Sequence, residues 1–200
     1  MTPMSADPAP ISARPTNHAL IVSAAIGAGS AFIGVPVLAR SEAPDTKAQV
    51  EAAFTPGDDI SGLIVRRIGE AKQSVQVQAY LFTDRSIANA LLAARKRGVA
   101  VEVVGDAAQH QSGGLPHLRA LERAGVRVFL NGTLAASHNK IVIVDGGIDS
   151  AAVITGSYNF TQAAQAKNAE NVVVISGNRN VTDRFVRNFE LHREQSTPWP

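Results

Sequence analysis

Two groups of residues in the second half of the chain have the types and spacing needed for chemistry on a phosphate ester. The first is His138 and Lys140, which are two positions apart, so on a β-strand both side chains point to the same face. An imidazole can act as a nucleophile or a proton carrier near neutral pH. The neighbouring ammonium adds a fixed positive charge, which favours a negatively charged substrate.

The second group begins 16 positions after Lys140, in the run Gly-Ser-Tyr-Asn. Gly156 allows close backbone approach, Ser157 offers a hydroxyl, and Asn159 offers an amide on the same side as Ser157. Together with the first pair, these side chains would form a pocket of donors for a phosphoryl group. Glu170 begins a further predicted strand, and we expect its carboxylate to accept a hydrogen bond from the imidazole of His138.

Alternating sequence patterns predict the elements that must position these residues. Residues 140–145 and 152–155 read as two strands joined by a Gly-Gly loop, which indicates a hairpin, and 171–175 reads as a buried strand. Strand–helix alternation before this hairpin predicts an α/β domain, in which a mixed β-sheet is flanked by helices on both faces. The earlier predicted elements are strands at 50–54, 74–80, 99–104 and 126–130, helices capped by Asp58 or Asp59 and by Asp84, a helix marked by Leu118 and Leu121, and a last helix over 182–192.

The pattern H-x-K-x4-D followed by G-S-x-N resembles the motif of the phospholipase D superfamily. The stretch from about Val50 to about His192 is similar to the small single-motif bacterial endonucleases of that family, most clearly in AYLFTD, KRGVAVEVV, GSYNFTQAA and KNAEN. One difference is the segment 146–155 between Asp145 and Gly156, which is longer than the family's usual spacer. We expect the extra length to lie in the hairpin turn, away from the pocket.

The resemblance implies a two-step phosphodiester hydrolysis through a phosphohistidine, without a metal or other cofactor. In-line displacement needs a nucleophile on one side of phosphorus and a proton donor on the other, and one histidine cannot occupy both places. The nearest second candidate, His117, lacks the lysine and the Gly-Ser-x-Asn run. We therefore predict a homodimer with its active site at the two-fold interface, where His138, Lys140, Ser157 and Asn159 of both chains surround one phosphate.

Two further motif residues are predicted to have structural roles. Asp145 lies five positions after Lys140 and so points to the opposite strand face, which favours a salt bridge or a turn. Gly156 belongs to a run that also forms a good turn. The remaining histidines have no supporting partners and stay unassigned; they are His18, His110, His117 and His192.

The N-terminal part differs from the rest of the chain. Residues 19–39 contain no charged residue and follow Arg14, and Val37 and Ala39 fill the small-residue positions before a cleavage site. This pattern predicts a signal peptide, and an uncleaved inner-membrane anchor over 19–39 or a buried core helix are the alternatives. We therefore divide the chain into a signal or anchor segment with its linker, 1–43, and an exported, periplasmic or secreted catalytic domain, 44–200.

Composition narrows the function classes. The absence of cysteine excludes a disulfide scaffold, a thiolate metal site and a cysteine nucleophile. A net charge of only +2 does not by itself indicate a nucleic-acid partner. Three functions remain: a nonspecific endonuclease acting on DNA or RNA, a phospholipase D acting on phosphatidyl lipids, and a non-catalytic phosphate-binding protein. The scarcity of aromatic residues, at 5%, favours the first over the second.

Overall fold

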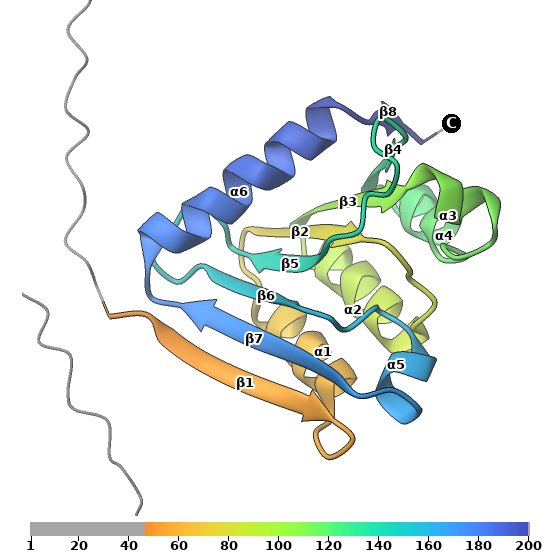
Figure 1. Cartoon of the computed structure of the whole chain (residues 1–200). Coiled ribbons are helices and arrows are strands. Elements are labelled where there is room, and N and C mark those ends of the chain that lie inside the picture. The colour runs from red at the N-terminus through yellow and green to blue at the C-terminus, as the bar shows by residue number, and fades with distance from the viewer. Residues whose placement is uncertain (1–46, 200) are drawn as a thin grey trace, which may run out of the picture. The chain divides into compact units, whose positions relative to one another are not determined.

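A computed structural model of the protein describes residues 47–199. The predicted signal or anchor segment, 1–43, lies outside the described residues. The described part contains an eight-stranded sheet with the order β1-β7-β6-β5-β2-β3-β4-β8 (Figure 1). Its strands are β1 (Gln49–Thr55), β2 (Ser74–Ala79), β3 (Ala100–Asp106), β4 (Arg127–Asn131), β5 (Lys140–Val144), β6 (Ala152–Gly156), β7 (Glu170–Ser176) and β8 (Thr197–Pro198).

The sheet is mixed, as the sequence predicted. Strands β2, β3 and β4 are parallel, whereas β5, β6, β7 and β1 pair antiparallel along the other half of the sheet. The predicted hairpin is β5–β6, and its turn lies at the opposite end of the strands from Lys140 and Gly156. The longer spacer of this chain therefore lies away from the candidate site, as expected.

Helices lie on both faces of the sheet (Figure 1). The two predicted aspartate caps are confirmed: Asp59 accepts from the backbone of Gly62, and Asp84 accepts from the backbone of Ser86 and Ile87. The helices are α1 (Ile60–Glu70), α2 (Arg85–Lys96), α3 (Ala107–Gln111), α4 (Leu118–Arg123), α5 (Gln162–Ala166) and α6 (Arg179–Glu194).

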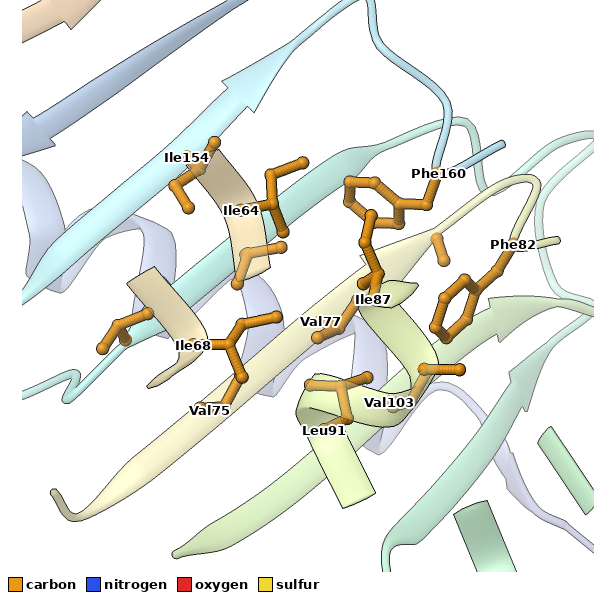
Figure 2. Close-up of a cluster of buried hydrophobic side chains, with 14 of the residues drawn as sticks. Ile64, Ile68, Val75, Val77, Phe82, Ile87, Leu91, Val103, Ile154 and Phe160 are labelled. Carbon is orange, nitrogen blue, oxygen red and sulfur yellow. The ribbon is translucent and has the colours of Figure 1, made fainter. Parts of the chain in front are cut away.

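The main core lies between the sheet and helices α1 and α2. Figure 2 shows Ile64 and Ile68 of α1 packed with Ile87 and Leu91 of α2 over the apolar side chains of β2, β3 and β6. A smaller cluster on the other face joins α6 to β3, β5 and β6 through Phe189. The layers bury the middle of the sheet and leave the strand ends as the available place for a polar site.

One edge of the sheet collects the predicted site residues. The parallel strands β2, β3 and β4 end there, β6 ends there at Gly156, and β5 and β7 begin there at Lys140 and Glu170. Ligand sites of open α/β sheets commonly lie outside the carboxyl ends of parallel strands. The fold therefore places the His-x-Lys and Gly-Ser-x-Asn segments at the same edge.

Three short elements were not predicted. Helices α3 and α5 have five residues each and strand β8 has two, lengths at which a helical or strand period is not visible in the sequence. Asp106 caps α3 and Thr161 caps α5. Within residues 47–199, no helix has the length and apolar character needed to cross a bilayer.

Candidate active site

His138 and Lys140 form a contacting pair at the start of β5. The Lys140 Nζ atom lies 3.1 Å from His138 Nδ1, and it donates to the His138 backbone carbonyl at 2.7 Å. The histidine side chain is exposed, whereas Lys140 is only 7% exposed. The pair therefore offers a reactive imidazole to solvent, with a largely buried cation fixed beside it.

The charge of Lys140 is shaped by its surroundings. Burial lowers the pKa of the Lys140 ammonium, and the negative charge of Glu170 partly opposes this by raising the pKa. A partly desolvated cation interacts more strongly with a phosphate than an ammonium in water does. This is the electrostatic role predicted for Lys140.

Ser157 lies at the end of β6 and is tied to β7. Its hydroxyl donates to Glu170 Oε2 at 2.5 Å and accepts from the backbone N–H of Asn171 at 3.1 Å. The second carboxylate oxygen of Glu170 accepts from Asn168 Nδ2 at 2.9 Å. Ser157 and Glu170 thus form a hydrogen-bonded unit at the exposed edge.

The predicted hydrogen bond between Glu170 and the His138 imidazole is not what the described structure shows. The Glu170 carboxylate is engaged by Ser157 and Asn168 instead. The sheet order gives the reason, because β6 lies between β7, which carries Glu170, and β5, which His138 precedes. Glu170 acts on the pair at longer range, through its charge on Lys140.

The side-chain amide oxygen of Asn159, Oδ1, is buried, and no described residue forms a hydrogen bond with it. A buried polar atom without a partner costs about 1–3 kcal/mol, and such atoms often mark sites that a ligand completes. The unpartnered atom is an acceptor, however, whereas a phosphate oxygen needs a donor, so the predicted phosphate-binding role of Asn159 depends on its side-chain N–H group and remains a prediction.

Asp145 has the predicted turn role at the far end of the hairpin. Its carboxylate accepts hydrogen bonds from the backbone N–H groups of Lys72, Gln73 and Ser74, at 2.7–3.1 Å. The residue has a positive φ of 51° directly after β5. No ion pair to Asp145 is present among the described residues, so its partners are backbone amides rather than the cation of a salt bridge.

Gly156 is needed for close backbone packing. A Cβ atom at this position would lie 2.1 Å from the carbonyl oxygen of Asn171, on the neighbouring strand. The expected close approach is therefore confirmed, but it occurs between β6 and β7. The glycine keeps the strand that carries Ser157 against the strand that carries Glu170.

The sequence did not single out two residues beside His138. The Tyr80 ring lies 4.3 Å from the His138 ring between centroids, and Lys140 Nζ lies 5.1 Å from the centre of the same tyrosine ring. Asp106, 2% exposed, accepts from the backbone N–H of Ser137, next to His138. Tyr80 ends the predicted strand 74–80, and Asp106 lies two residues after the predicted strand 99–104. The signal that would have linked them to His138 is the strand order, which the sequence does not contain.

His117 does not form a second histidine–lysine pair. Its Nε2 atom lies 3.1 Å from the Thr83 carbonyl, and its ring packs edge-on against Phe82. These contacts give His117 a structural environment. Among the described residues, the His-x-Lys arrangement therefore occurs once.

The sequence and the fold match known proteins. Residues 64–193 match a family model described as cardiolipin synthase, PLD-like domain. A phospholipase D from Rickettsia felis is 35% identical over 150 residues, which are 75% of this chain and 72% of that protein. A mitochondrial cardiolipin hydrolase from Xenopus laevis is 31% identical over 138 residues, covering 69% of this chain and 62% of that protein.

Solved structures agree with this match. Nuc from Salmonella typhimurium, described as a phospholipase D family member, aligns with a TM-score of 0.69 and 31% identity, over 76% of this chain and 99% of that one. NucT from Helicobacter pylori aligns with a TM-score of 0.68 at 20% identity, over 76% of this chain and 100% of that one, and supports the fold alone. The fold and the site define a phosphodiester hydrolase. The chain belongs to the phospholipase D superfamily, and within it to the Nuc-like members.

Proposed function

We propose that the protein is a nonspecific endonuclease that cleaves DNA through a phosphohistidine intermediate, without a metal. The observation that carries this proposal is the contact between the exposed His138 imidazole and the buried Lys140 ammonium. A nucleophilic nitrogen beside a fixed cation suits attack on an anionic phosphodiester. Asn159, which follows the adjacent strand, offers its side-chain N–H group as a further donor for the phosphate oxygens, whereas the Ser157 hydroxyl donates to Glu170 in the described structure.

The reaction proceeds in two displacements. The imidazole nitrogen of one His138 forms a bond to phosphorus, the bond from phosphorus to the leaving oxygen breaks, and the partner subunit's His138 gives that oxygen a proton. The partner subunit's His138 then takes a proton from water, whose oxygen bonds to phosphorus as the phosphorus–nitrogen bond breaks. The products are an alcohol and a phosphate monoester, and both imidazoles return to their starting states.

This chemistry requires a second copy of the chain. Each copy supplies one His-x-Lys pair, and His117 is held by Thr83 rather than free to act as the opposing acid. We therefore propose a homodimer in which a two-fold axis passes near His138. In such an isologous interface the same surface of each copy meets itself, so both pairs face one phosphate.

The sheet face that carries α6 offers a surface for this partner. Val50 and Phe54 of the edge strand β1 are 64% and 57% exposed, and the strand register puts Val50 in line with Ile175 and Val153 on the α6 face. A groove of about 450 Å³ lies on α6 and the neighbouring strands, and its lining includes Asn139. Asn139 lies between His138 and Lys140 in the chain, so the groove reaches the segment that carries the site, from the sheet face opposite to their side chains.

Substitution on β1 tests the proposed interface. Phe54→Asp should convert the dimer to a monomer and abolish cleavage, because each half-site then lacks its opposing histidine. Ala93→Asp, on the exposed side of α2, is the matched control and should remain dimeric and active. Light scattering coupled to size exclusion measures both states. A Phe54→Asp variant that is monomeric and fully active would contradict the shared site.

The substrate is tested by parallel assays in a chelator. Plasmid DNA and phosphatidylcholine vesicles are incubated with the wild-type protein and with His138→Asn. Nicking of DNA by the wild type alone supports the proposal, whereas choline release without nicking supports a phospholipase. Activity that appears only when divalent metal is added back contradicts the metal-free mechanism.

A phospholipase D remains the second candidate because relatives that cover most of this chain carry that name. A lipid substrate requires apolar surface beside the reacting groups. Among the exposed large hydrophobic residues of the described chain, Leu134 is the one in the loop that leads to His138. The residues around Ser157 are polar, including Asn168 and Asn171. These surroundings favour the nuclease.

We further propose that the protein is exported through the segment at 19–39. The charge-free stretch after Arg14 and the small residues at its end support this proposal. The mass of the exported protein separates the alternatives, because cleavage should leave a chain that begins near Arg40. A full-length exported product would instead indicate an anchor.

A further inference from the structure

We propose that Tyr80 is a positioning residue for His138, and that Gln109 and Asp106 hold Tyr80 and the histidine loop in register. The inference rests on the proposed role of His138 in the reaction. It concerns a residue outside the His-x-Lys and Gly-Ser-x-Asn segments, on a different strand of the sheet. Tyr80 directly follows β2, which pairs with β5 so that Ala79 lies opposite Lys140.

The need for positioning comes from the exposure of His138. Its side chain is exposed, and the hydrogen-bond and ring–ring contacts to its ring within residues 47–199 come from Lys140 and Tyr80. The two rings are 4.3 Å apart and inclined by 58°. Lys140 contacts the ring nitrogens through its ammonium group, whereas the rigid Tyr80 ring packs against the imidazole ring itself. Tyr80 is therefore the element that limits the rotation of the imidazole.

Tyr80 is itself fixed by a chain of hydrogen bonds. The Gln109 Nε2 atom donates to the Tyr80 hydroxyl at 3.0 Å, and the backbone N–H of Gln109 donates to Asp106 Oδ1 at 2.8 Å. The other oxygen of Asp106 accepts from the backbone N–H of Ser137 at 2.7 Å. Since Ser137 precedes His138, the chain closes on itself. We call these residues the Tyr80 brace: Tyr80, Gln109, Asp106, Ser137 and His138.

The burial of Asp106 makes the brace rigid. Its carboxylate is 2% exposed, and it spans two segments, the start of α3 and the loop before β5. Hydrogen bonds to a buried charged acceptor are among the stronger ones in proteins. In-line displacement depends on the direction of the attacking nitrogen, and a misplacement of about 1 Å can cost about 10²-fold in rate. The brace supplies this alignment before substrate arrives.

Two substitutions in the full chain test the inference. Tyr80→Leu removes the ring, and we expect kcat to fall by about 10- to 100-fold while KM stays within about 2-fold. Tyr80→Phe keeps the ring and loses the bond to Gln109, so we expect a decrease of less than about 5-fold. Trp199→Leu is the matched control, because Trp199 forms a similar ring contact, at 4.4 Å, with His110. The control should leave kcat unchanged.

A spectroscopic readout in the free protein separates positioning from general damage. With labelled histidine, the His138 ring protons are identified as the resonances missing in His138→Asn. We expect the Tyr80 ring current to displace these resonances, Tyr80→Leu to return them toward the values of a free histidine, and Tyr80→Phe to retain most of the displacement. If Tyr80→Leu does not fold, Gln109→Met tests the brace by releasing the hydroxyl alone, with a smaller loss of kcat and a smaller shift.

The outcomes distinguish this inference from the proposed function. Unchanged His138 resonances and unchanged kcat in Tyr80→Leu overturn the positioning role. A raised KM with full kcat also overturns it, because Tyr80 would then bind substrate. If His138→Asn is as active as the wild type, the proposed function fails, while the resonances still report whether Tyr80 holds the ring.

Discussion

Mixing wild-type and His138→Asn chains should reveal whether two subunits share one active site. Each chain contributes one intact pair, in which His138 Nδ1 lies 3.1 Å from Lys140 Nζ, so the substitution removes one reacting group without moving the other subunit's pair. Asparagine cannot form the phosphohistidine or carry the proton. We therefore expect the pure variant to lose activity by at least about 10³-fold while it remains dimeric.

The magnitude follows from the stoichiometry of the site. Equal amounts of the two chains that reassociate at random give about one quarter wild-type dimers, one half mixed dimers and one quarter variant dimers. If both copies of His138 act on one phosphate, the mixed dimers are inactive. The mixture then has about a quarter of the activity of pure wild-type protein at the same total protein concentration. Independent subunits would instead give about half.

The assay needs dimers that have exchanged their subunits. Two different affinity tags and refolding of the mixture allow the mixed dimers to be isolated, and their plasmid-nicking rate is measured directly. The control is a wild-type dimer that carries one tag on each chain. A substitution at Asn139 would not serve as a control, because Asn139 donates to Gln78 beside the site. Purified mixed dimers with half the wild-type rate would refute the shared site.

Three further substitutions test the remaining parts of the site. Glu170→Gln removes the charge that raises the pKa of Lys140, so burial, which lowers that pKa, is no longer opposed. In a pH–rate profile, the alkaline limb, where Lys140 loses its proton, should therefore move to lower pH. Asp145→Ala removes the acceptor of several backbone N–H groups and should cost about 3 kcal/mol in urea unfolding, whereas Asp145→Asn should cost less. Gly156→Ala places a Cβ against backbone 2.1 Å away and should cost at least about 2 kcal/mol in thermal unfolding.

Local features of the fold were predictable because their causes are local. Asp59 and Asp84 cap helices through bonds to residues two or three positions away, so their spacing to the apolar stripe is visible in the sequence. The same applies to the β5–β6 hairpin, whose strands are adjacent in the chain. His138 and Lys140 share a face because two residues on one strand do so.

Features that depend on strand order were not predictable. Nothing near Glu170 in the sequence shows that β6 separates its strand from His138, and the expected partner was therefore wrong. Tyr80 lies 58 positions before His138, and the two rings meet because β2 pairs with β5 across the middle of the sheet. Asp106 joins α3 to the histidine loop by the same long-range arrangement.

The two ends of β5 explain why one motif contains both reacting and structural residues. Asp145 binds the backbone N–H groups that lead into β2, and the antiparallel ladder then runs from Val75 opposite Val144 to Ala79 opposite Lys140. A slip of one residue in this ladder would turn Lys140 to the other face of the sheet. By fixing the register at one end of the strand, Asp145 determines where the cation and Tyr80 meet His138 at the other. Asp145 therefore influences the site from the other end of β5, by fixing the register of the strand. Because the register is fixed there, the longer turn that follows Asp145 leaves the reacting residues in place.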